Sequence, residues 1–154
     1  MPEKLLEEAE NAAEKRKAQL EKEAPLEPRG VWMREGMKAY LCGTLGQQFD
    51  AWQRRLSALS AADAYFSQQI GLEAIEKKMD ALEEEVKATL LASESLSPRR
   101  SPGYGNMPLS FSGEIIAKLN ATKILGVSLT ASGLMVPSKS VTAICEIKRE
   151  EENG

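Results

Sequence analysis

Apolar residues recur at helical spacing between Leu45 and Leu91, and this is the longest periodic pattern in the chain. In the first half of this stretch the apolar positions follow one another in steps of four and three. That is the a/d spacing of a heptad, which places the side chains in one stripe along a helix. After Gly71 the stripe restarts in a new phase, so the region is expected to form one long amphipathic helix or a hairpin of two. The stripe residues, which we predict to form an interface, are Leu45, Phe49, Trp52, Leu56, Leu59, Phe66 and Ile70.

Two positions are candidates for a break in this helix. Ser60 and Asp63 have the spacing of a capping box, and Gly71 interrupts the apolar pattern. Neither position has the cluster of Pro, Gly or Asn that usually marks a helix–helix loop, so we expect the helix to continue through both. A helix of this length would extend for roughly 70 Å at 1.5 Å per residue. A lone helix does not remain stable in water, so the pattern predicts a partner: folded-back N-terminal helices, a second copy or another protein.

The flanks of the stripe divide the chain into further segments. Residues 1–24 are rich in Ala, Glu, Lys and Leu and predict a charged N-terminal helix. Pro25 and Pro28 end it, because the residue before a proline disfavours helical geometry. Apolar residues within 31–42 fit a helical face, so residues 31–92 as a whole are expected to be a helical or coiled-coil region. Residues 93–108 hold the prolines, glycines and serines of a linker.

Residues 109–150 are richer in β-branched residues and predict a small β region. Residues 140–148 alternate apolar and polar positions, which makes them the best strand candidate in the chain. Residues 121–131 also indicate a strand, whereas residues 109–119 are ambiguous between strand and helix. The expected fold class is therefore α+β, with long amphipathic helices followed by an antiparallel three-stranded β meander.

Composition removes much of the usual active-site chemistry. The chain has 154 residues, 20 basic and 23 acidic residues, a net charge of -3 and no histidine, so the commonest general base and metal ligand are missing. Cys42 and Cys145 are isolated and are expected to be reduced and packed as small hydrophobes. The acidic run Glu83–Glu85 is expected to be a solvated helix face, because adjacent helical residues point in different directions. We expect no catalytic residue, cofactor or metal.

The linker carries the remaining candidate chemistry. Ser97 precedes a proline and two arginines, a pattern typical of phosphorylation by proline-directed kinases. Arg99, Arg100 and Tyr104 are candidates for contact with unpaired bases and phosphates. An unmodified, solvated linker is the simpler interpretation of the same residues.

These patterns favour a non-enzymatic structural or interaction protein that assembles through its apolar stripe, as a homo-oligomer or as a subunit of a complex. One alternative is a nucleic-acid-associated accessory protein that uses the basic linker, although nucleic acid is the less favoured partner. Another is a holdase chaperone with helical arms on a β base, which resembles prefoldin in architecture only. No apolar run reaches the ~20 residues of a membrane-spanning helix, and the N-terminus lacks a signal-peptide pattern, so we expect a cytoplasmic location and no membrane insertion.

Overall fold

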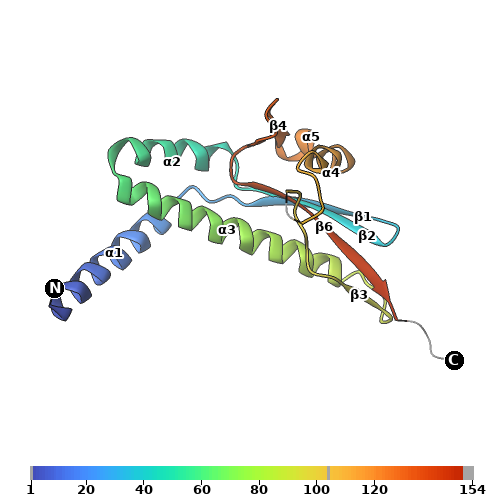
Figure 1. The fold of residues 1–154 in the computed structure, drawn as a ribbon, viewed down its shortest axis with the longest axis horizontal. Coiled ribbons are helices and arrows are strands. Elements are labelled where there is room, and N and C mark those ends of the chain that lie inside the picture. The colour runs from blue at the N-terminus through green and yellow to red at the C-terminus, as the bar shows by residue number, and fades with distance from the viewer. Residues whose placement is uncertain (1, 104, 151–154) are drawn as a thin grey trace.

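A four-stranded antiparallel sheet lies at the centre of the chain, with the strand order β1-β2-β6-β3 (Figure 1). The computed structural model describes residues 2–103 and 105–150. The strands are β1 (Arg29–Glu35), β2 (Lys38–Thr44), β3 (Glu94–Leu96) and β6 (Ser140–Arg149), and β4 (Ser128–Leu129) pairs with β5 (Met135–Val136) in a second, two-stranded sheet. The α+β class with long helices and an antiparallel sheet is confirmed. The three-stranded meander is wrong, because the central sheet has four strands drawn from both halves of the chain.

Helices cover both faces of the central sheet. The long helix α3 (Ala61–Lys87) lies along one face, and α4 (Phe111–Leu119) with the short α5 (Ala121–Leu125) lies on the other (Figure 1). On the α3 side, Met79, Leu82 and Val86 pack against Leu41 and against small side chains of β2 and β6. None of the helices in the described ranges is long and apolar enough to cross a bilayer.

The segment that we expected to be helical over residues 31–42 instead forms the β1–β2 hairpin. Both faces of this hairpin are covered, because Leu41 faces α3 while Tyr40 and Cys42 face α4. A strand that is buried on both faces loses the apolar–polar alternation that identifies strands in a sequence. Its apolar residues were therefore wrongly assigned to one face of a helix.

The stripe region is a helical hairpin, and the prediction of one continuous helix is wrong. Helix α2 (Gln47–Leu59) ends at Ser60, whose φ of -157° and ψ of 125° are extended, and α3 begins at the next residue. The Ser60 hydroxyl accepts a hydrogen bond from the Asp63 amide at 3.2 Å, so this serine caps α3. The reversal lets the first half of the stripe pack against the second, with the Phe49 ring lying directly over Gly71.

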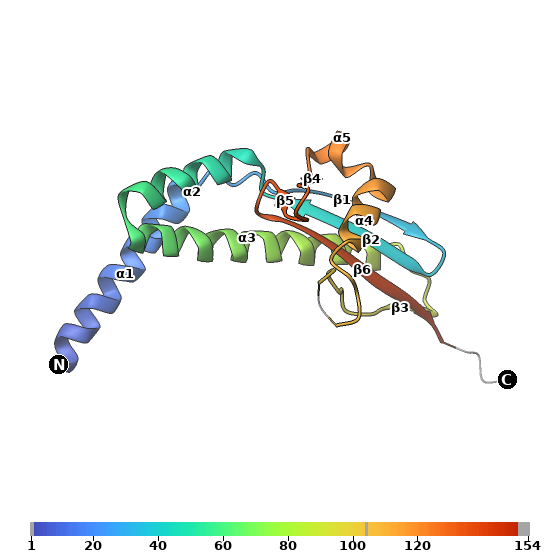
Figure 2. The same cartoon turned by 45° about the horizontal axis from the view of Figure 1, so that its top comes forward.

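Helix α1 (Glu3–Glu23) is attached to the body only through its C-terminal half. Leu20 is fully buried there, and the Arg16 guanidinium holds Asp63 by hydrogen bonds of 2.7 and 3.0 Å. Lys17 adds an ion pair of 2.8 Å with Glu73. The first turns of α1 extend away from the rest of the molecule, as Figures 1 and 2 both show.

The C-terminal part contains more helix than we predicted. Residues 111–119 and 121–125 form α4 and α5, so the strand expected over 121–131 is reduced to Ser128–Leu129. Asn120 separates the two helices with a φ of 54°, a left-handed conformation that asparagine tolerates better than most residues. Residues 140–149 form β6, which confirms the strongest strand prediction.

Candidate ligand-binding groove

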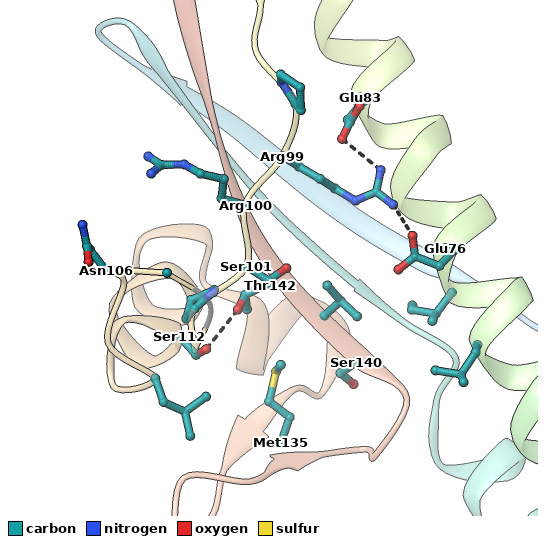
Figure 3. Close-up of a pocket in the computed structure, with 17 residues that line it drawn as sticks. Glu76, Glu83, Arg99, Arg100, Ser101, Asn106, Ser112, Met135, Ser140 and Thr142 are labelled. Atoms are coloured by element: carbon teal, nitrogen blue, oxygen red, sulfur yellow. Dashed lines mark hydrogen bonds and ion pairs between the residues drawn. The ribbon is translucent and has the colours of Figure 1, made fainter.

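An open groove of about 900 Å³ lies where the segment predicted as a linker passes between α3 and the start of β6 (Figure 3). Its walls come from four parts of the chain: the side of α3, the loop over residues 98–109, the first turn of α4 and the segment 135–142. Segments far apart in the sequence therefore meet here. The lining residues used below are Leu72, Glu76, Glu83, Arg99, Arg100, Leu109, Ser112, Met135, Ser140 and Thr142.

Arg99 fixes the loop against α3. Its guanidinium lies 2.6 Å from Glu76, 2.7 Å from Asp80 and 2.9 Å from Glu83, three carboxylates that follow one face of α3. Burial alone would lower the pKa of Arg99, but the hydrogen bonds to Asp80 and Glu83 outweigh burial and raise it. Since one cation faces three anions, this wall of the groove keeps an excess of negative charge.

Arg100 points away from α3, on the other side of the loop (Figure 3). Its backbone amide and carbonyl both pair with Ile144 at 2.9 Å, which joins the loop to the edge of β6. Its side chain is 62% exposed and forms an ion pair of 3.2 Å with Glu146. This guanidinium keeps donors that face solvent, whereas Arg99 is enclosed by its partners.

The floor of the groove consists of buried hydroxyl groups. The Thr142 hydroxyl donates to Ser112 at 3.1 Å, which connects β6 to the first turn of α4 (Figure 3). The Ser140 hydroxyl donates to the Pro137 carbonyl at 2.7 Å and lies 2.7 Å from the Thr44 hydroxyl. These bonds connect β6 to α4, to β2 and to the turn before β6, and so hold the floor of the groove together.

Part of the groove lining is apolar. Leu72 of α3 is 56% exposed, Leu109 of the loop is 53% exposed and Met135 is half-buried. Apolar side chains beside a small set of fixed polar groups are typical of small-molecule sites.

The residues that we predicted to form an interface lie elsewhere, around the α2–α3 hairpin. Most of them are enclosed by the same chain: Leu45, Phe49, Trp52 and Ile70 are buried, Leu56 and Phe66 are half-buried, and Leu59 is 83% exposed. Much of the cover that we expected from a partner comes from α1 and from the hairpin itself.

The linker residues are partly accounted for. The half-buried Ser97 donates its hydroxyl to the Glu146 carbonyl at 2.9 Å, and its phosphorylation stays a prediction. Arg99 is engaged by three carboxylates, whereas Arg100 pairs with Glu146 and keeps donors that face solvent, so contact of these residues with nucleic acid stays a prediction. Tyr104 lies outside the described residues.

Cys42 and Cys145 are both buried and unpaired, as expected. They lie on neighbouring strands, but Cys42 packs on the α4 side of the sheet and Cys145 on the α3 side, so they cannot meet. Burial raises the pKa of Cys42 to about 12 and that of Cys145 to about 11. Both thiols therefore remain protonated and unreactive at neutral pH.

No group of three or more Cys, Asp or Glu residues within the described ranges is arranged to hold a metal ion. Most of the groove was not visible in the sequence. The arginine pair and the α3 acids were each recognisable, but their pairing depends on the path of the loop. The hydroxyl residues at 112, 140 and 142 stand in no motif.

Comparison with known proteins gives a likeness to solved structures. No family model matches the chain, and no curated protein matches it. The fold is similar to that of a solved structure described as the MetH reactivation domain bound to AdoHcy, with a TM-score of 0.60 and 20% identity. The likeness covers 76% of this chain and 41% of that one, so this chain spans well under half of its neighbour. At this identity the likeness concerns the fold alone.

Proposed function

We propose that the protein is a binding module whose groove takes S-adenosylhomocysteine or a ligand of the same class, an adenosine joined through sulfur to an amino acid. The observation that carries the proposal is an open groove of about 900 Å³ on a fold similar to that of a domain solved with AdoHcy bound. Small-molecule sites typically have volumes of about 300–1,000 Å³, so the groove is large enough.

The chemistry of the groove supports this class of ligand. The apolar side chains of Leu72, Leu109 and Met135 in the lining offer contact area for a purine ring. The Glu76 carboxylate, whose side chain is 62% exposed, can accept hydrogen bonds from an ammonium group or from ribose hydroxyls. The Arg100 guanidinium, on the other side of the loop, has donors left for an acceptor group of the ligand such as its carboxylate.

Isothermal titration of AdoHcy into the whole chain tests the proposal. We expect saturable binding to the wild type, and binding at least tenfold weaker, equivalent to about 1.4 kcal/mol, for Glu76→Gln and for Arg100→Ala. Matched controls are Glu84→Gln, on an exposed part of α3 that does not line the groove, and Arg55→Ala on α2. Both controls should bind like the wild type.

A wild-type chain that does not bind AdoHcy would remove this proposal. So would controls that weaken binding as much as the groove variants, because the effect would then be one of overall charge. Far-UV circular dichroism of each variant shows whether the fold is kept, and all four changed side chains are largely solvent-facing.

We extend the proposal to a non-catalytic role in the cytoplasm. The two unpaired, buried thiols support a reducing compartment. Prolonged incubation of AdoHcy with the protein, followed by mass analysis, should return the ligand unchanged. A product that depends on the protein would instead indicate an enzyme.

An interaction role, as a homo-oligomer or a subunit, remains a second candidate, and the projecting start of α1 favours it. Leu5 is 50% exposed and Leu6 is 52% exposed on a helix that extends away from the body (Figure 2). Sedimentation equilibrium tests it: self-association should be lost on changing both leucines to glutamate. A wild type that is monomeric at every accessible concentration removes the homo-oligomer version.

A further inference from the structure

A second cavity, of about 830 Å³, lies between α2, the first turns of α3 and the turn that leads into β6. It shares no lining residue with the groove described above. It is open to solvent, and its lining residues, most of which carry a polar group, are Asp50, Gln53, Arg54, Ser57, Ala64, Tyr65, Gln68, Ser138 and Lys139.

Lys139 enters this cavity from a fixed piece of backbone. Its carbonyl accepts a hydrogen bond from the Leu45 amide at 2.9 Å, which holds the turn against the start of α2. Its side chain crosses α3 at Gly71, where an added Cβ would lie only 3.0 Å from the lysine Cε. Packing against Gly71 therefore fixes the course of the Lys139 side chain beside the cavity that it lines. Burial lowers the pKa of Lys139, and the charge of Asp50 opposes that effect only in part.

The nearby carboxylate is already engaged. Asp50 accepts hydrogen bonds from the Ser138 amide at 2.8 Å and from the Ser138 hydroxyl at 2.7 Å. Within residues 2–103 and 105–150, neither Lys139 nor Arg54 forms an ion pair within 4.0 Å. The cavity thus holds two cations without close partners and one anion that is bonded to the turn.

We propose that this cavity is an oxyanion site, in which Lys139 and Arg54 receive a phosphate or carboxylate group of a small molecule. Guanidinium and ammonium groups form their strongest hydrogen bonds with such charged acceptors. The amides of Gln53 and Gln68 and the Tyr65 hydroxyl line the remaining space and supply neutral hydrogen-bonding groups for the body of the ligand. This site is independent of AdoHcy binding in the groove.

The test uses inorganic phosphate as the probe and the whole chain labelled with ¹³C at its lysines. The Cε resonance of Lys139 is followed as phosphate replaces chloride at constant ionic strength and neutral pH. We expect a saturable shift, and a rise in the pKa of Lys139 when phosphate is bound, because a neighbouring anion favours the protonated amine. The exposed Lys77 serves as the internal reference and should shift only slightly and linearly.

Variants show which residues bind the phosphate. Arg54→Gln should weaken phosphate binding at least tenfold, whereas Arg55→Gln, the next residue and not part of the cavity lining, should leave it unchanged. Lys139→Met keeps the aliphatic chain over Gly71 and should abolish saturable binding, followed through the tyrosine resonances. A Lys139 resonance that responds no more than Lys77, or equal effects of the two arginine variants, overturns the proposal.

Discussion

Replacing Phe49 with alanine tests whether the stripe is buried within one chain. The side chain is fully buried, its ring centroid lies 5.5 Å from that of Trp52, and its edge would be only 2.8 Å from a Cβ at position 71. Such a truncation removes transfer energy and leaves a cavity, which lowers the free energy of unfolding by about 3–5 kcal/mol. For a chain of this size the melting temperature should fall by roughly 6–20 °C.

The matched variant is Leu59→Ala, from the same predicted stripe. Leu59 is 83% exposed, so its truncation should change the free energy of unfolding by no more than about 0.5 kcal/mol. Urea unfolding followed by far-UV circular dichroism, at two protein concentrations, measures both variants. If the loss for Leu59→Ala equals that for Phe49→Ala, or if the midpoints rise with protein concentration, another chain covers the stripe and our description of the hairpin is wrong.

Four further variants probe other contacts. Hydrogen bonds from the Arg34 guanidinium and, second, from the Leu91 amide lower the pKa of Glu94 from 4.5 to about 2. The wild type should therefore lose stability as the pH falls from 4.5 toward 2, because Glu94 becomes protonated and loses these bonds. In acid-unfolding curves, Glu94→Gln should lose less stability over this range. Gly71→Ala should lower the free energy of unfolding by up to about 2 kcal/mol, although alanine favours a helix, because the new methyl group meets the Phe49 ring. Gly113→Ala meets no atom nearer than 3.4 Å and should raise the free energy of unfolding by up to about 1 kcal/mol in the same urea assay. Arg99→Gln should speed amide hydrogen exchange at residues 97–103, because it removes the ion pairs that hold this loop on α3, whereas unchanged exchange would show that backbone pairing alone fixes the loop.

The sequence was most informative where one physical signal dominated. The charged helix before Pro25 was predicted from its helix propensity. The strand after Ser140 was predicted from its alternation of apolar and polar residues, although the structure buries both faces of much of β6. The capping box at Ser60 was also visible. We set it aside because a single extended residue between two helices leaves none of the usual loop residues.

The remaining elements depend on contacts that are remote in the sequence. The β1–β2 hairpin resembled a helix because α3 and α4 bury its two faces, and neither cover can be known from residues 31–42 alone. The groove is assembled in the same way: Arg99 meets Glu76 across 23 residues and Thr142 meets Ser112 across 30. Spacing along the chain does not predict such pairs.

The most direct test of the proposed ligand site is amide chemical-shift mapping of the ¹⁵N-labelled chain during a titration with AdoHcy. We predict saturable shifts concentrated at Leu72, Arg100, Ser112 and Thr142, with the second cavity around Arg54 left unchanged. An absence of saturable shifts, or shifts confined to residues outside the groove, would contradict the proposal that this groove binds the ligand.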